Sequence, residues 1–155
     1  MTSDLTGNAG STVSLADTGP VITATVTLPH CSPQRALDAF TDPAVLARWW
    51  QGELSARLEP GGEYTVAFPS IGSVLTGTVV SYHPAGSLEF SWSWDGSPPD
   101  STVAVLVAAG PADGSAVVTI EHGPHADDEA GRTGHQVHWD GWQFFLPRLA
   151  AELGG

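Results

Sequence analysis

The sequence is poor in positive charge. Its 155 residues include five cationic side chains, all Arg, against 17 acidic ones, which gives a formal net charge of -12 at pH 7. A chain with this balance repels the phosphates of nucleic acids and the anionic head groups of lipids. The composition therefore excludes nucleic acids and membranes as main partners.

The sequence also lacks the features that indicate a membrane span, an export signal or a nucleotide cofactor. No apolar run approaches the ~18 residues of a membrane span. Residues 1–19 contain no charged segment followed by an apolar one. The single Cys31 cannot form an internal disulfide, which fits a reducing compartment. Because no phosphate-binding loop or dinucleotide fingerprint is present, we expect a cytoplasmic protein without a cofactor.

The beginning of the chain differs in composition from the rest. Residues 1–19 are rich in Ser, Thr, Gly and Asp, and their apolar residues are scattered. Such a segment has little apolar surface to anchor it. We therefore predict a flexible N-terminal tail over residues 1–19 and a single domain over residues 20–155.

The spacing of apolar residues predicts an α+β domain. Residues 21–28 alternate as a half-buried strand, and two short helices begin at Ser32-Pro33 and Asp42-Pro43. Residues 53–123 alternate with short connections, which is typical of an antiparallel meander. Residues 135–153 have helical period. The expected fold is a curved antiparallel sheet of six or seven strands around a long C-terminal helix, with two short helices after the first strand.

Several short motifs appear in this order of elements. They are Phe40-Thr41-Asp42-Pro43, Arg48-Trp49-Trp50, Glu59-Pro60-Gly61-Gly62-Glu63-Tyr64, Gly77-Thr78-Val79, His83-Pro84, Trp92 and Gly141-Trp142. Over residues 21–153 the chain resembles the START-like (SRPBCC, helix-grip) superfamily, and within it the group of the activator of Hsp90 ATPase. The resemblance implies a cavity between the sheet and the last helix that holds an apolar small molecule. Some relatives in antibiotic-producing bacteria sequester a reactive enediyne product or are sacrificed to it.

Aromatic side chains are placed to line such a cavity. The sequence contains six Trp, and Leu88, Phe90, Trp92 and Trp94 share one face of a predicted strand. Indoles offer flat apolar faces and one N–H donor each, which suits a flat polycyclic ligand. The alternative is a core that these rings fill completely. The predicted ligand-binding residues are Trp50, Tyr64, Phe68, Trp92, Trp94, His122, His138, Trp142 and Phe145.

Histidines are the candidates for a catalytic base. His122 continues the inward alternation of the last predicted strand, and His138 lies on the apolar arc of the last helix. The pairs His122/His125 and His135/His138 also have a spacing that suits Zn²⁺. Because no Cys or well-placed carboxylate strengthens that set, we predict no metal site.

Three functions stay open from the sequence. The favoured one is non-enzymatic binding or sequestration of an apolar, polycyclic or polyketide-type small molecule, in antibiotic (enediyne) self-resistance or biosynthesis. The first alternative is a polyketide cyclase or hydrolase that uses a pocket histidine, and the second is a regulator of Hsp90. Binding is favoured because neither a carboxylate pair nor a Gly-x-Ser-x-Gly motif is present. We expect a monomer or a weak dimer.

Overall fold

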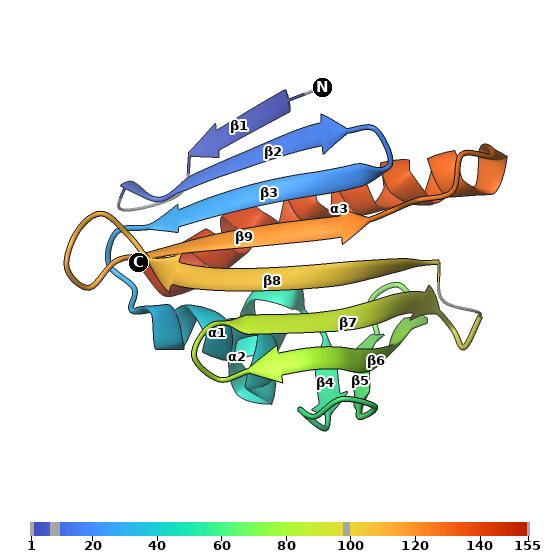
Figure 1. The fold of residues 1–155 in the computed structure, drawn as a ribbon, viewed down its shortest axis with the longest axis horizontal. Coiled ribbons are helices and arrows are strands. Elements are labelled where there is room, and N and C mark those ends of the chain that lie inside the picture. Colours follow the sequence, from blue (N-terminus) through green and yellow to red (C-terminus); the bar gives the residue numbers. More distant parts are fainter. Residues whose placement is uncertain (1, 7–9, 98–99, 155) are drawn as a thin grey trace.

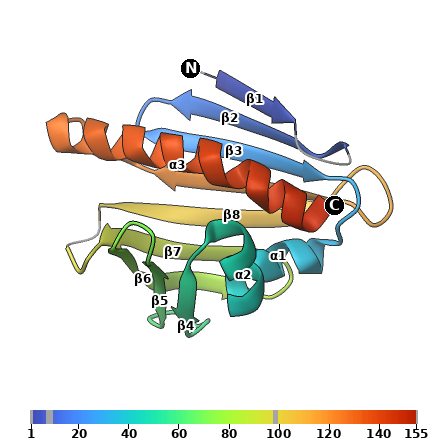
Figure 2. The same ribbon diagram turned by 180° about the vertical axis from the view of Figure 1, so that it is seen from behind.

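A computed structural model describes residues 2–6, 10–97 and 100–154. Its described strands form one antiparallel sheet of nine strands in the order β1-β2-β3-β9-β8-β7-β6-β5-β4 (Figure 1). The elements are β1 (Thr2–Thr6), β2 (Thr12–Thr18), β3 (Val21–Leu28), α1 (Pro33–Thr41), α2 (Pro43–Trp50), β4 (Glu53–Ala56), β5 (Glu63–Phe68), β6 (Ser73–His83), β7 (Ser87–Trp94), β8 (Ser101–Ala109), β9 (Ala116–Gly123) and α3 (Glu129–Gly154). All three helices lie on the same face of the sheet (Figure 2). The predicted α+β helix-grip fold is confirmed.

The strands form where the sequence alternates. Every second residue of β3, from Ile22 to Leu28, is buried, and these residues pair with the inward residues of β9. In the same way Leu88, Phe90 and Trp92 of β7 face the helices. Because side chains of a strand point alternately to its two faces, this pattern places one apolar face of the sheet against α3. The strands β3 to β9 account for the six or seven that we expected.

The expectation of a flexible tail over residues 1–19 is wrong for the described part of that segment. β2 pairs with β3 along its whole length, and β1 pairs with β2 as the edge strand. Val13 and Leu15 of β2 are buried in the core. Their alternation with polar neighbours was the available signal, and burial of their side chains against α3 decides the outcome. Residues 1 and 7–9 of the expected tail lie outside the described residues.

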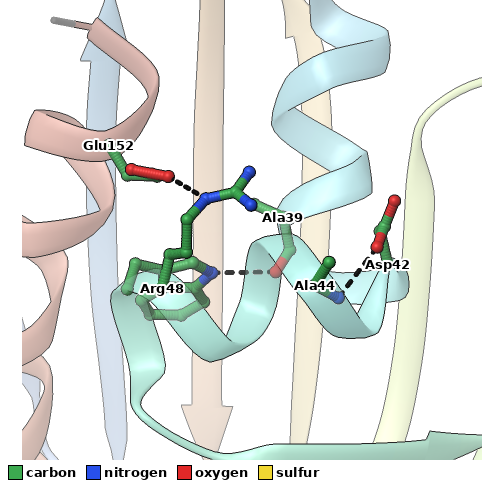
Figure 3. Close-up of polar contacts among 6 residues, drawn as sticks. Ala39, Asp42, Ala44, Arg48 and Glu152 are labelled. Atoms are coloured by element: carbon green, nitrogen blue, oxygen red, sulfur yellow. Dashed lines mark hydrogen bonds and ion pairs between the residues drawn. The ribbon is translucent and has the colours of Figure 1, made fainter.

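The two short helices start as predicted and are tied to α3. The Asp42 carboxylate caps α2 by accepting a hydrogen bond from the backbone N–H of Ala44 at 2.9 Å (Figure 3). Pro43 occupies the first turn of α2, where a missing N–H costs nothing. Arg48 of α2 forms an ion pair with Glu152 near the end of α3 (Figure 3). This ion pair lies at the surface, where α2 and the C-terminal end of α3 are side by side.

The C-terminal helix is longer than predicted, because it begins at Glu129 rather than at His135. Asp128 precedes it, and its carboxylate accepts a hydrogen bond from the N–H of Gly131 at 2.7 Å. A Cβ on Gly131 would lie 1.9 Å from the Ala126 carbonyl oxygen, so only glycine fits here. Glycines such as Gly131 and Gly134 are typical of loops, but in the structure they lie inside the first turns of the helix.

The inward face of α3 forms much of the core. Its buried residues are His138, Trp139, Trp142, Leu146, Leu149, Ala150, Leu153 and Gly154. This stripe agrees with the apolar arc expected from the helical period. Among the described residues, no helix combines the length and the apolar character needed to cross a membrane.

Candidate ligand-binding site

An aromatic pocket opens between the middle of α3, the end of α2, the β5–β6 turn and β7. Its lining residues are Trp50, Phe68, Ser70, Ile71, Trp92, Trp94, Val137, His138, Gly141, Trp142 and Phe145. Seven of these belong to the nine predicted ligand-binding residues. The volume is about 160 Å³, similar to a cavity that holds one benzene ring. The side chains therefore fill most of the space between helix and sheet and leave room for about one ring.

Two predicted residues do not line this pocket. Tyr64 is fully buried, stacks on Phe90 with 4.1 Å between ring centroids, and donates a 2.6 Å hydrogen bond to the Phe40 carbonyl. Burial also raises the pKa of Tyr64, so its hydroxyl stays protonated. His122 is buried behind the wall and accepts a hydrogen bond from Trp142. Tyr64 is therefore a core residue, and His122 supports the wall.

Four lining residues were missed, namely Ser70, Ile71, Val137 and Gly141. Ile71 and Val137 are 65% and 53% exposed, so they form an apolar rim. A Cβ built on Gly141 would meet no atom within 4 Å, which means that this glycine borders open space. For Ile71 the sequence offered only an apolar residue in a Pro-Ser-Ile-Gly turn, and turn residues have no periodicity that reveals their direction. Val137 and Gly141 lie eight and four residues before Phe145 in α3, so the helical period was the available signal for them.

The walls of the pocket are packed rings. Trp50 lies at their centre, with its ring centroid 5.7 Å from that of Phe68, 5.9 Å from Trp92 and 5.6 Å from Trp142. These edge-on and tilted contacts of Trp50 suit the quadrupoles of aromatic rings. The indole N–H of Trp92 is buried and has no hydrogen-bond partner among the described residues. A flat aromatic ligand would extend the same packing.

Behind one wall, hydrogen bonds fix the orientation of two histidines. The Trp94 indole N–H is 3.2 Å from Nε2 of His138, and Nδ1 of His138 is 2.9 Å from Nε2 of His125. An indole nitrogen only donates, so Nε2 of His138 accepts and its Nδ1 carries the proton. His125 then accepts at Nε2 and donates from Nδ1 to the Pro20 carbonyl at 3.0 Å. Each ring therefore has one defined neutral tautomer.

A second chain of hydrogen bonds runs beside the first. The Trp142 indole donates to Nδ1 of His122 at 3.0 Å, so His122 carries its proton on Nε2. That N–H donates to Ser101 Oγ at 2.9 Å, and the Ser101 hydroxyl donates to the Asp100 carboxylate at 2.7 Å. The His122 and His138 rings stack with centroids 4.3 Å apart. The two chains thus form one histidine cluster, which we define as His122, His125 and His138.

The surroundings keep the whole cluster neutral. Burial, reinforced by the neighbouring His125 and His135, lowers the pKa of His138 to about 3. Burial also lowers the pKa of His122 and of His125. Charging any one of these rings would remove a cation from water and place it beside other imidazoles. At neutral pH the cluster is therefore uncharged.

The histidine cluster also has to be considered as a metal site. One ligand nitrogen from each ring lies within 4.8 Å of the others, and three neutral imidazoles are good ligands for Zn²⁺. However, indole N–H groups occupy the lone pairs of His122 and His138, and His138 occupies that of His125. A metal ion would have to displace these donors. The hydrogen bonds therefore argue against a metal here, and its absence stays a prediction.

A second, polar pocket of about 660 Å³ lies at the start of α3. Asp17 and Pro20 line it from the β2–β3 turn, and His125, Asp127 and His135 line it from the other side. Nε2 of His135 lies 3.3 Å from Asp17 Oδ1 without hydrogen-bond geometry. This pocket was not expected, because the sequence placed Asp17 in a tail. The His125–His138 hydrogen bond links this pocket to the aromatic pocket.

Comparison with protein families identifies the fold of this site. Residues 30–154 match the Activator of Hsp90 ATPase homolog 1-like protein family. The chain belongs to this family. The match covers both short helices, β4 to β9 and α3, so all lining residues of the aromatic pocket lie within it.

Solved structures share the architecture at low identity. DynU16, a protein in the dynemicin biosynthetic locus, is 24% identical with a TM-score of 0.69; the match covers 84% of this chain and 46% of DynU16. The present chain therefore spans about half of that protein. CalU16 from Micromonospora echinospora is 20% identical with a TM-score of 0.64, covering 100% and 84% of the two chains. The Aha1 dimer from Colwellia psychrerythraea is 18% identical with a TM-score of 0.67, covering 86% and 96%. No sequence of a curated protein matches the chain significantly.

Proposed function

We propose that this protein binds an apolar aromatic small molecule in the aromatic pocket. The observation that supports this most is an open space of about 160 Å³ whose walls are indole and phenyl rings. In a filled core these rings would close the gap, since protein interiors pack as densely as organic crystals. One ring of a ligand fits inside, and the rest of a polycyclic ligand would lie against the apolar rim of Ile71 and Val137.

The specific form of the proposal is sequestration of a polycyclic or polyketide-type product in antibiotic self-resistance or biosynthesis. Support comes from DynU16, which is tied to the dynemicin locus and has the same fold. Binding without chemistry is sufficient for such a role. In this proposal the protein acts in the cytoplasm as a monomer or a weak dimer.

The test uses 4-nitroanisole, a one-ring probe, and Trp fluorescence. The wild-type protein should show saturable quenching. Gly141→Leu places a side chain in the open space of the pocket, and it should weaken binding about tenfold or more, equivalent to about 1.4 kcal/mol. Leu is also the better helix former, by roughly 0.8–1 kcal/mol relative to Gly. The free energy of unfolding should therefore not fall.

Gly134→Leu is the matched control. Gly134 lies in the same helix, also borders open space and does not line the aromatic pocket. This variant should bind 4-nitroanisole like the wild-type protein. Equal loss of binding in both variants, or no saturable quenching in the wild-type protein, would contradict the proposal.

Regulation of Hsp90 is a second candidate, which the family match and the likeness to the Colwellia Aha1 structure favour. It makes a separate prediction, because a regulator acts through its surface rather than through the pocket. The wild-type protein and Gly141→Leu should then change the ATPase rate of Hsp90 equally. No change of that rate in either protein would remove this candidate.

A further inference from the structure

The aromatic pocket and the polar pocket are joined by two histidines. His138 lines the aromatic pocket and His125 lines the polar one. The N–H of His138 Nδ1 donates to His125 Nε2 across 2.9 Å, with the direction set by the Trp94 donor on the far side of His138. A proton therefore has a continuous path from an apolar site to a polar one.

We propose that His138 and His125 together accept a proton from a hydroxyaromatic ligand of the phenol class. The inference rests on the proposed function, because the ligand must occupy the aromatic pocket. The ligand O–H bond breaks as an N–H bond forms at Nε2 of His138. The Nδ1–H bond of His138 breaks as an N–H bond forms at Nε2 of His125. The ligand keeps the electron pair as a phenolate, and the positive charge ends on His125.

Two histidines can accommodate the positive charge of the accepted proton, whereas His138 alone cannot. A charge on His138 would lie in an apolar wall, stacked on His122 and close to His125 and His135. Transfer to His125 moves the charge to a ring whose Nδ1–H already donates to the Pro20 carbonyl. Burial and His135 lower the pKa of His125, whereas the Pro20 carbonyl, Asp100 and Asp17 act against that shift. The transfer therefore moves the positive charge away from the apolar wall and toward the Pro20 carbonyl, Asp100 and Asp17.

Trp94 acts as a positioning residue in this scheme. In the free protein its N–H occupies Nε2 of His138 and so keeps the other proton on Nδ1, ready for transfer. This hydrogen bond, at 3.2 Å, is the longest of its chain. When a ligand hydroxyl takes its place, the indole N–H is released to donate to the phenolate oxygen. The pocket therefore favours a ring whose hydroxyl reaches the Trp94–His138 contact.

The experiment compares 4-nitrophenol with 4-nitroanisole, which has the same ring but no acidic proton. The absorption spectrum of nitrophenol distinguishes phenol from phenolate. In the wild-type protein, bound nitrophenol should ionise about one pH unit or more below the pH at which it ionises in His125→Gln. The Gln amide can still accept from His138 but takes up no proton. Both proteins should bind 4-nitroanisole with affinities within about twofold.

His83→Gln is the matched control, since it removes an exposed histidine at the end of β6. It should leave the ionisation of bound nitrophenol at the wild-type pH. If nitroanisole binds but bound nitrophenol ionises at the same pH in the wild-type protein and His125→Gln, the proton-acceptor proposal is wrong and ligand binding stands. If nitroanisole does not bind, both proposals fall.

Nitrogen NMR of the wild-type protein keeps the test decisive if His125→Gln does not fold. Addition of nitrophenol should shift Nε2 of His125 from the resonance of an acceptor nitrogen to that of a protonated one, and nitroanisole should not. An unchanged His125 would overturn the proposal. So would stoichiometric binding of Zn²⁺ that shifts the His122, His125 and His138 resonances together, because it would identify the cluster as a metal site.

Discussion

Two stretches of α3 bury their inward faces in different ways. The C-terminal stretch packs Leu146, Leu149 and Leu153 into the core, away from the aromatic pocket. The middle stretch presents His138 and Trp142, which hydrogen bonds hold in fixed orientations beside an open space. Aliphatic side chains adjust their rotamers until gaps close. Rings anchored at their N–H groups cannot turn freely into a gap, so the space beside them stays open.

The largest expected effect tests the C-terminal stretch of α3. Leu149→Ala should lower the free energy of unfolding by about 2–5 kcal/mol, because it removes a fully buried side chain. Affinity for 4-nitroanisole should change little, since Leu149 does not line the aromatic pocket. Urea denaturation and fluorescence titration measure the two effects.

Phe145→Ala is the counterpart on the pocket side of the same helix. Phe145 is only partly buried and lines the pocket, so its loss should cost less stability and more affinity than that of Leu149. If both variants lost stability and neither lost affinity, the middle stretch of α3 would be an ordinary core.

The second largest expected effect is a loss of folding stability at acid pH. The pKa of His138 is about 3 in the folded protein, whereas an unfolded His titrates near ~6.5. As the pH falls from about 6.5 toward 3, the unfolded chain takes up a proton that the folded chain refuses. Stability should therefore be constant above about pH 7 and fall by about 3 kcal/mol between pH 7 and 4 from His138 alone.

Denaturation midpoints across this range measure the slope. His138→Gln should make the slope shallower and leave the part that comes from the lowered pKa values of His122 and His125, whereas Leu149→Ala should lower stability at every pH and keep the slope. A wild-type protein whose stability did not depend on pH between 7 and 4 would mean that the cluster is open to water.

The smallest effect comes from a single hydrogen bond. Trp142→Phe keeps an aromatic wall but leaves Nδ1 of His122 without its donor. The loss of an otherwise satisfied buried contact should cost about 1–2 kcal/mol. Nitrogen NMR should show a larger share of the tautomer with the proton on Nδ1 of His122, because the Ser101–Asp100 contact is then the remaining contact that favours a proton on Nε2. A single unchanged tautomer in this variant would show that Ser101 and Asp100 are sufficient to set the tautomer of His122.

Much of the fold was readable from local patterns. Val13 and Leu15 show the limit of that approach, since two alternating residues were too short a signal and only pairing with β3 identified the strand. Gly131 shows another limit, because a glycine indicates a loop until the cap at Asp128 and the close Ala126 carbonyl are known. The residues of the aromatic pocket also divide into those that local patterns predicted and those that they did not. Alternation predicted Trp92 and Trp94, while the rim at Ile71 came from a turn whose direction no period reveals.

The sequence by itself determined which residues face inward, because the periods of strand and helix are local properties of the backbone. Only the tertiary structure decided how those residues meet. His125 and His138 are 13 positions apart, and they touch because the turn after β9 carries the chain back along the sheet into α3. The volume of the pocket was decided in the same way. This volume is the space that the rings of α2, β5, β7 and α3 leave unfilled. It depends on the orientations of these rings, which their hydrogen bonds and ring contacts set.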